Sequence, residues 1–328
     1  MSASLRVAVV GAGWIAGEHL AALPRLGASV AGVCDLDAER AAAAARPAGA
    51  PAYTDVEELL ERERPQAVFV CTPPLAHRDP ALVIIERGLH LYLEKPIART
   101  QGDAQAIVDA AARSDAVCAI GYQWRALELL DDVRRELEGQ AIGLLVGRSI
   151  GPTRSRPWFL DRAQGGGNVL ERASHQIDLQ RAIAGEVEAV QAAPSRVLLA
   201  QGAGETGNIE DAAVLTLRFV SGAVGSIVIA WTRDDSPGIY SLDIVAEDAT
   251  LQLALDPDFR LSGVAQGRAV AVTARQHPLE RSLARFLEAA RAGDQSLVFC
   301  RPADAAATLA VAGACEQALS SGALVQVQ

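Results

Sequence analysis

The chain has 328 residues, of which half are apolar, and a formal net charge of −10. Its length predicts two domains. The negative charge argues against a nucleic-acid partner, because basic patches supply most of the affinity for nucleic acids. The longest apolar runs, such as residues 224–231, are too short to span a bilayer. We therefore expect no membrane association, and the amino terminus predicts no signal peptide.

The first part of the chain alternates strand and helix patterns. Apolar strands are predicted at residues 5–10, 29–34, 67–71, 89–94 and 116–120, with helices at 14–26, 38–46, 56–64, 80–87 and 101–113. Fully apolar strands that alternate with helices are typical of a doubly wound parallel sheet covered on both faces. We place this α/β domain, of Rossmann type, over residues 1–123.

The pattern changes after Gly121. Helices are predicted at 126–138, 169–184, 278–292 and 303–320, and strands at 144–150, 187–199, 213–220, 224–231, 240–246 and 250–255. Successive strands without intervening helices indicate antiparallel pairing. Residues 124–328 are therefore predicted to form an α+β domain with a large, mostly antiparallel open sheet.

The five cysteines are scattered and form no C-x-x-C pair; they are Cys34, Cys71, Cys118, Cys300 and Cys315. Reduced thiols in a cytoplasmic protein are the simplest interpretation.

A glycine motif follows the first predicted strand. Residues 11–16 read GAGWIA, which matches G-x-G-x-x-G/A at a strand-to-helix turn. Gly11 permits the tight turn, Gly13 lets a pyrophosphate approach the backbone, and Ala16 keeps the helix close to the strand. We include Trp14 and Ile15, at the helix start, among the expected cofactor contacts. The alternative is a glycine turn with no ligand.

Asp35 ends the second predicted strand, nineteen residues after Ala16. A carboxylate at this place accepts hydrogen bonds from the adenosine ribose and repels a 2′-phosphate, so NAD is preferred over NADP. Arg40 on the next helix keeps NADP possible. The alternative role for Asp35 is that of a solvated helix cap.

Two further segments end predicted parallel strands: Cys71-Thr72-Pro73-Pro74 and Glu94-Lys95-Pro96. Ligands of open α/β sheets bind at such strand ends. Lys95 is the single lysine among thirty cationic side chains. Lysine can exchange a proton when its surroundings shift its pKa, whereas arginine keeps its proton. The alternatives are plain proline turns and chance in residue usage.

Three ionisable residues follow a triple glycine at 165–167, which would let a substrate approach the helix closely. Glu171, His175 and Asp178 are spaced i, i+4, i+7, which would put them on one face of an α-helix. A solvated face, a metal site and a catalytic acid/base set all fit this spacing. No H-E-x-x-H motif or further nearby histidine is present, so no metal is expected, and we favour catalysis.

Together these motifs resemble the glucose–fructose oxidoreductase/inositol dehydrogenase (Gfo/Idh/MocA) family. The resemblance rests on GAGWIA at 11–16, CTPP at 71–74 with His77 after it, EKP at 94–96, GYQWR at 121–125, and GGG with E-x-x-x-H-x-x-D at 165–178. It implies a Rossmann domain followed by an α+β domain whose open sheet mediates assembly into a homodimer or homotetramer.

The resemblance also implies roles for residues. Lys95 matches the family's catalytic lysine and His175 its catalytic histidine, whereas Glu171 stands where many members have Asp. It adds His77, Glu94 and Gln123 to the expected cofactor contacts. Weaker substrate candidates are Trp124, Arg125, Trp158, Arg162 and Trp231.

We therefore expect an NAD(P)-dependent oxidoreductase that acts on a secondary alcohol or ketone of a sugar, polyol or cyclitol. His175 would take the hydroxyl proton, Lys95 would stabilise the developing alkoxide, and Glu171 would orient His175. Two alternatives remain open. One is a non-redox protein of the same fold that senses the bound nucleotide; the other is a hydrolase or lyase that oxidises its substrate transiently.

Overall fold

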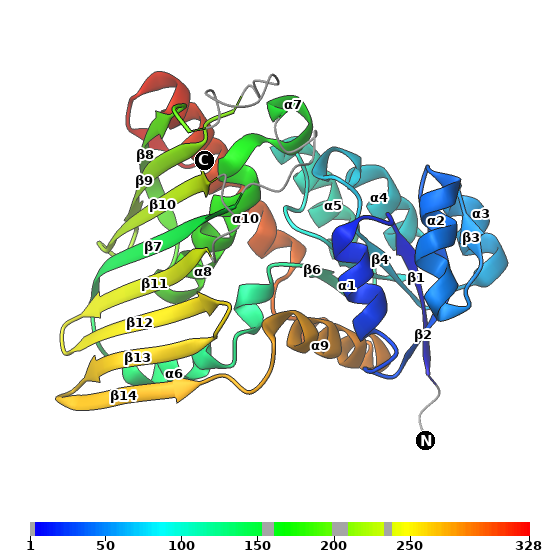
Figure 1. The fold of residues 1–328 in the computed structure, drawn as a ribbon, viewed down its shortest axis with the longest axis horizontal. Coiled ribbons are helices and arrows are strands. Elements are labelled where there is room, and N and C mark those ends of the chain that lie inside the picture. Colours follow the sequence, from blue (N-terminus) through cyan, green and yellow to red (C-terminus); the bar gives the residue numbers. More distant parts are fainter. Residues whose placement is uncertain (1–3, 153–160, 199–208, 233–237) are drawn as a thin grey trace. The chain divides into compact units, whose positions relative to one another are not determined.

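The computed structural model describes residues 4–152, 161–198, 209–232 and 238–328 (Figure 1). The predicted substrate residue Trp158 lies outside these described residues. The chain divides into two compact units. The first comprises Met1–Gln123 and Leu279–Ala306, and the second comprises Trp124–Pro278 and Ala307–Gln328. The sequence placed residues 279–306 in the second domain, whereas the structure assigns them to the first unit.

The described part of the first unit contains a six-stranded parallel sheet in the order β3-β2-β1-β4-β5-β6. The strands are β1 (Leu5–Val10), β2 (Ala28–Cys34), β3 (Ala52–Tyr53), β4 (Ala67–Val70), β5 (His90–Leu93) and β6 (Cys118–Ile120). The connecting helices are α1 (Trp14–Ala22), α2 (Ala38–Ala45), α3 (Val56–Glu63), α4 (Arg78–Glu86) and α5 (Gln101–Ala112). This order is that of the Rossmann fold, so the predicted fold of this region is confirmed. The strand order reverses between β1 and β4, which makes their carboxyl ends the place where such sheets bind ligands.

Helix α9 (Pro278–Ala292) explains the corrected domain boundary. Its side chains Leu283, Phe286 and Leu287 are buried in the same core as Val7 of β1 and Phe69 of β4. Helix α9 therefore completes the core of the parallel sheet, although it follows the second sheet in the sequence. The helical pattern of residues 278–292 was predicted correctly, but local periodicity does not show which sheet an apolar helix face covers.

The described part of the second unit contains a nine-stranded sheet in the order β14-β13-β12-β11-β7-β10-β9-β8-β15. The strands are β7 (Ile142–Pro152), β8 (Val187–Ser195), β9 (Ala212–Phe219), β10 (Val224–Thr232), β11 (Ile239–Ala246), β12 (Ala249–Asp256), β13 (Arg260–Ala265), β14 (Arg268–Thr273) and β15 (Val325–Gln326). All neighbours are antiparallel except β7 and β10, which confirms the predicted mostly antiparallel sheet. Strands β13 and β14 were not predicted, because most of their side chains are at least partly exposed and their apolar alternation is weak.

Helix α8 (Ser174–Ala184) packs against β7 and β10. Buried Gln176 donates from Nε2 to the carbonyl oxygens of Arg148 and Ser241, both at 3.1 Å, and Gln180 donates to Ser226 at 3.2 Å. These glutamines anchor the helix on one face of the sheet. Side chains that point to the other face include exposed Leu144, Val214, Val224, Val245 and Val264.

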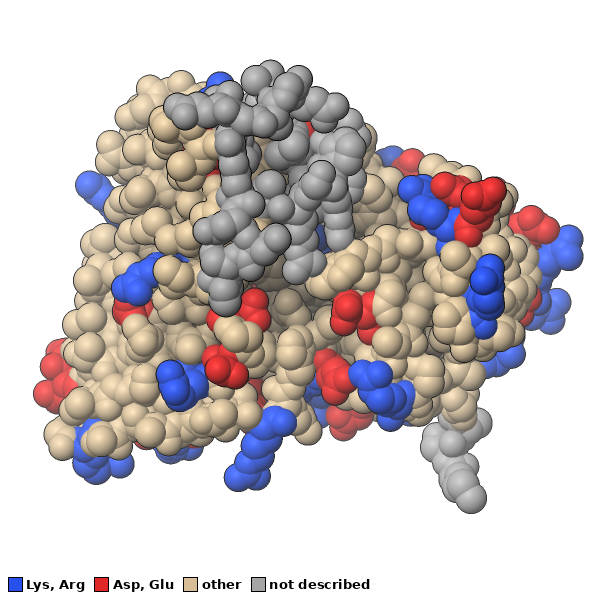
Figure 2. All heavy atoms as spheres, in the orientation of Figure 1, with Lys and Arg blue, Asp and Glu red and all other residues tan. Residues whose placement is uncertain are grey.

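Two observations bear on partners. On the face shown in Figure 2, basic and acidic side chains are interspersed, and no broad area of one sign is visible. Among the described helices, none combines the length and hydropathy that crossing a bilayer requires.

Candidate cofactor and catalytic site

Gly11 is required by the packing of the protein itself. Its φ is +92°, and its N–H donates to the Cys34 carbonyl oxygen at 2.7 Å. A Cβ atom here would lie 2.7 Å from the carbonyl carbon of Cys71. Only glycine permits this left-handed turn and the close approach of β1 to the end of β4.

Gly13 is different, because nothing in the described chain requires a glycine there. Its φ is −78°, and a Cβ atom would meet no other atom within 4 Å. It caps α1 with no side-chain hydrogen bond, and the first turn of the helix contains no acidic residue. Half-exposed Trp14 and partly buried Ile15 follow, and buried Ala16 packs against the core. Open space at a helix amino terminus fits a pyrophosphate, which the backbone N–H groups would bind.

Asp35 lies beside this turn at the end of β2. Its Oδ2 accepts the Ala12 N–H at 2.8 Å, and its Oδ1 accepts the Asp37 N–H and the Arg40 guanidinium, both at 2.9 Å. Partial burial raises the pKa of Asp35, but the two N–H donors and Arg40 outweigh it, so the net pKa is lowered. An ionised carboxylate is thus held at the turn, as a ribose-binding aspartate requires.

The segment after β4 begins with buried Cys71, whose N–H donates to Val10 at 2.7 Å. Thr72 is half-buried, Pro73 is exposed, and Pro74 is buried in the short helix η2 (Pro74–Ala76). The carboxyl ends of β1 and β4 are thus adjacent, and the exposed proline is at their rim.

His77 is fully buried, and both of its ring nitrogens contact carbonyl oxygens. Nδ1 lies 2.8 Å from the Pro96 oxygen and Nε2 lies 2.7 Å from the Thr72 oxygen. Burial lowers the pKa of His77 and outweighs the two carbonyl oxygens, which raise it. His77 was predicted to contact the cofactor, but its imidazole has no exposed surface. The ring instead links the turn after β4 to the turn after β5.

The turn after β5 contains Lys95. The Glu94 carboxylate is buried; its Oε1 lies 2.8 Å from His19 Nε2, and its Oε2 accepts the Lys95 backbone N–H at 3.1 Å. The Lys95–Pro96 peptide is cis, and Lys95 is half-buried. The buried Glu94 carboxylate therefore binds the backbone of the turn and connects it to His19 of α1. Gln123, also half-buried, begins the short helix η3 (Gln123–Ala126).

In the second unit, Glu171 and His175 belong to different kinds of helix. Glu171 lies in the π-helical turn η5 (Val169–Ala173), and His175 lies in the first turn of α8. The helix predicted over residues 169–184 is present, but its first turn is π-helical rather than α-helical. Both side chains are half-buried, and the imidazole lies 5.1 Å, centroid to centroid, from the ring of buried Trp124.

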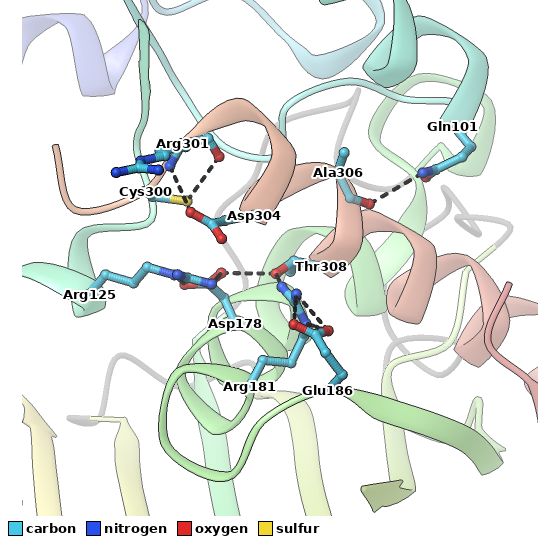
Figure 3. A network of polar contacts seen from close by, with 10 residues as sticks. All are labelled: Gln101, Arg125, Asp178, Arg181, Glu186, Cys300, Arg301, Asp304, Ala306 and Thr308. Atoms are coloured by element: carbon cyan, nitrogen blue, oxygen red, sulfur yellow. Dashed lines mark hydrogen bonds and ion pairs between the residues drawn. The ribbon is translucent and has the colours of Figure 1, made fainter. Parts of the chain in front are cut away.

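Asp178, the third residue of that spacing, is buried in a polar network (Figure 3). Arg125 donates to both carboxylate oxygens, at 2.8 and 2.9 Å, and Thr308 of α10 (Pro302–Ser321) donates at 2.9 Å. Arg181 donates to the Thr308 hydroxyl at 2.6 Å and pairs with Glu186. Burial raises the pKa of Asp178, and Arg125, Thr308 and Arg181 offset part of that rise. Asp178 thus anchors α8, and the guanidinium of the predicted substrate residue Arg125 is engaged with it.

Packing within the protein explains two glycines of the run at 165–167. Gly166 and Gly167 have φ values of +80° and +84°, and a Cβ atom would collide with Leu170 at the first and crowd Arg162 at the second. Arg162, a predicted substrate residue, pairs with the buried carboxylate of Glu210. These glycines therefore need no substrate to account for them.

Trp231, another predicted substrate residue, is buried at the end of β10. The Arg172 guanidinium lies 6.0 Å from its ring centroid and donates to the carbonyl oxygens of Ala230, at 3.2 Å, and Pro152, at 3.1 Å. Arg172 thus ties η5 to the ends of β10 and β7.

Comparisons with known proteins agree with both units. Residues 5–122 match the family model "Oxidoreductase family, NAD-binding Rossmann fold", and residues 143–252 match the "GFO/IDH/MocA C-terminal domain". The chain belongs to the Gfo/Idh/MocA family. The 1,5-anhydro-D-fructose reductase of Ensifer adhaerens is 31% identical over 69% of each chain. Levoglucosan dehydrogenase of Pseudarthrobacter phenanthrenivorans is 28% identical over 60% of this chain, and this match spans only 57% of that enzyme. A solved levoglucosan dehydrogenase in complex with NADH and levoglucosan has the same fold, with a TM-score of 0.86, 20% identity and 99% coverage of both chains.

In this Gfo/Idh/MocA chain, three residues that contact candidate residues or their neighbours were not singled out from the sequence: His19 in the first unit, and Arg172 and Thr308 in the second. A signal existed for His19, because it follows Ala16 at helical spacing on the buried face of α1. Thr308 stands in an alanine-rich helix, and its partner Asp178 is 130 residues away. Within the described ranges, no group of three or more His, Cys, Asp or Glu side chains is placed to hold a metal ion.

Proposed function

We propose that this protein is an NAD(H)-dependent dehydrogenase or reductase that transfers a hydride between nicotinamide and a secondary alcohol or ketone of a sugar, polyol or cyclitol. The observation that carries the proposal is the Lys95 turn. The chain's single lysine follows a parallel strand, β5, that only β4 separates from the strand before the glycine turn, and its backbone N–H donates to the buried carboxylate of Glu94. The family and the sugar substrates named for its relatives support it.

The preferred cofactor is NAD. The glycine turn would bind its pyrophosphate at Gly13, and Asp35 would accept the ribose hydroxyls. The lowered pKa of Asp35 keeps this carboxylate ionised, which disfavours the 2′-phosphate of NADP. Arg40 pairs with Asp35 rather than presenting an uncommitted charge to a phosphate. The exposed Pro73 and the Lys95 turn would border the nicotinamide.

The bound cofactor supplies the hydride acceptor, and the chain supplies the proton acceptor and the field. In the oxidation direction, the His175 imidazole takes the hydroxyl proton as the carbon loses its hydride, since histidine is the side chain that most often acts as a general base. The Lys95 ammonium stabilises the negative charge that develops on the substrate oxygen. Glu171 orients the imidazole, whose ring packs against Trp124.

The decisive experiment incubates the purified protein with NAD and a panel of anhydro sugars, aldoses, alditols and inositols, and follows absorbance of the reduced nicotinamide. We expect net NADH formation with at least one member of the panel. Cofactor binding without turnover would instead favour the nucleotide-sensing protein. Substrate conversion without net NADH would favour the hydrolase or lyase.

The proposal also covers the oligomeric state of the protein and its cellular location. The first unit binds the cofactor, and the second supplies substrate residues and the assembly surface. The exposed face of the nine-stranded sheet, which bears Leu144, Val224 and Val245, would pair two copies into a homodimer or into half of a homotetramer. The five cysteines are free and buried, which supports a reducing, cytoplasmic setting.

A further inference from the structure

A buried histidine on α1, His19, contacts Glu94, the residue before Lys95. His19 is fully buried, and its ring lies 5.8 Å from that of Phe69 and 5.5 Å from that of Tyr92, centroid to centroid. Only its Nε2 has a hydrogen-bond partner among the described atoms, namely Glu94 Oε1 at 2.8 Å. Burying a polar ring in an apolar cluster is costly, and the bond to Glu94 offsets that cost at Nε2 but not at Nδ1.

The Glu94 carboxylate is held on three sides. His19 binds Oε1, and the Lys95 backbone N–H donates to Oε2 at 3.1 Å. On the third side lies Gly121, where a Cβ atom would be 3.0 Å from both carboxylate oxygens. The absence of a side chain at Gly121, which follows β6, therefore leaves space for this carboxylate. Through its two oxygens, the carboxylate connects His19 of α1 to the backbone of Lys95.

The opposite side of the turn is also fixed. The Pro96 carbonyl oxygen lies 2.8 Å from Nδ1 of His77, whose other nitrogen contacts the Thr72 carbonyl. The residues on either side of Lys95 are thus each bound to a buried imidazole. The Lys95 side chain starts from a backbone that has little freedom to shift.

We propose that His19 is a positioning residue for Lys95, acting through the Glu94 carboxylate that holds the Lys95 N–H. This inference rests on the proposed function, in which Lys95 stabilises charge on the substrate oxygen. A misplacement of about 1 Å at such a group costs about a hundredfold in rate. The competing interpretation is that His19 only fills space among the aromatic rings.

Two substitutions separate positioning from packing. His19→Gln keeps a donor near the place of Nε2, whereas His19→Leu keeps apolar volume and removes the donor. A packing role predicts that leucine is tolerated at least as well as glutamine. A positioning role predicts the reverse order. His90 is the matched control. It begins β5, the strand that leads to Lys95, and its Nδ1 accepts the Val117 N–H, but it makes no bond to Glu94.

The first measurement uses the single lysine. Labelling with ¹⁵N-lysine gives one backbone amide signal, that of Lys95, whose proton shift and hydrogen exchange report the bond to Glu94. We expect His19→Leu to shift this signal upfield and to speed its exchange about tenfold or more. His19→Gln should stay within about threefold of wild type in exchange rate, and His90→Leu should leave the signal unchanged.

The second measurement is steady-state turnover with the best substrate of the panel. His19→Leu should lower kcat about tenfold or more, with the KM values for NAD and substrate within about twofold, and His19→Gln should restore most of kcat. If leucine and glutamine give equal kcat, or if the Lys95 amide is the same in all variants, the inference is wrong.

The amide measurement needs no activity, so it distinguishes the two proposals. A wild-type protein without turnover overturns the proposed function, while a shifted Lys95 amide in His19→Leu still establishes the link from α1 to the turn. Should His19→Leu not fold, Glu94→Gln takes its place, since it weakens the acceptor for the Lys95 N–H and keeps the volume. An unchanged Lys95 amide in Glu94→Gln overturns the inference.

Discussion

The two units hold their candidate residues by different forces. In the first unit, the Lys95 turn is fixed by backbone groups and buried imidazoles: Glu94 binds the Lys95 N–H, and His77 joins two carbonyl oxygens. In the second unit, the helix that carries His175 is fixed by a charge network, in which Asp178 binds Arg125 and Thr308.

The difference predicts different responses to substitution. Removing one member of a buried ion pair leaves an uncompensated charge and costs more than removing one ordinary hydrogen bond. The second unit should therefore lose stability when its network is cut. The first unit should lose geometry or cofactor preference while it remains folded.

The largest expected effect comes from Asp178→Asn. The amide keeps the shape and an acceptor but leaves the Arg125 guanidinium without this counter-charge. We expect the free energy of unfolding to fall by about 3 kcal/mol or more, measured by urea denaturation. Asp243→Asn is the control, because it cuts the more exposed pair with Arg148 in the same unit and should cost less than about 1 kcal/mol. Equal losses in the two variants would contradict a special role for the buried network.

An intermediate effect is expected for Asp35→Ala in the first unit. Loss of a carboxylate that binds the ribose should weaken NAD about tenfold, while NADP binds as before or more tightly. The measurement is isothermal titration of both cofactors. The control Asp37→Ala removes the cap of α2, which should cost about 1 kcal/mol of stability and leave NAD affinity unchanged. If both cofactors weaken equally in Asp35→Ala, Asp35 does not bind the ribose.

The smallest effect concerns pH and His77. Its pKa is lowered in the folded protein by burial. Between the folded pKa and the higher pKa of the unfolded state, His77 is protonated in the unfolded chain and neutral in the folded chain. The stability linked to His77 is complete above about pH 6.5 and is lost as the pH falls through the folded pKa. His77→Gln cannot titrate, so its urea midpoint should fall less steeply than that of wild type as the pH drops below 6.5. Parallel curves would show that His77 is not the group responsible.

The same contrast explains what the sequence predicted well. The parallel sheet, the glycine turn and the two strand ends were predicted because each depends on residues close together in the chain. Gly11 and Asp35 directly follow apolar strands, and Lys95 is the second residue after one. The strand order of the Rossmann fold brings those strand ends to one edge.

Long-range partners escaped prediction for a physical reason. Nothing local to Asp178 indicates that Thr308 will satisfy it, and nothing near residue 286 shows that Phe286 will pack on Phe69. The π turn that contains Glu171 was not predicted either, because such a turn is set by packing and leaves little mark on the sequence. Gly166 and Gly167 suggested a substrate, but their neighbours in the fold explain them.

The most direct test of the account is Lys95→Arg, which keeps the positive charge but changes its geometry and prevents proton exchange. NADH formation should be measured with the best substrate of the panel, alongside NAD affinity. We predict that turnover falls by about a hundredfold or more, while the Kd for NAD stays within about threefold of wild type. Turnover at the wild-type rate with arginine at this position would contradict the central claim that the lysine after β5 acts on the substrate oxygen.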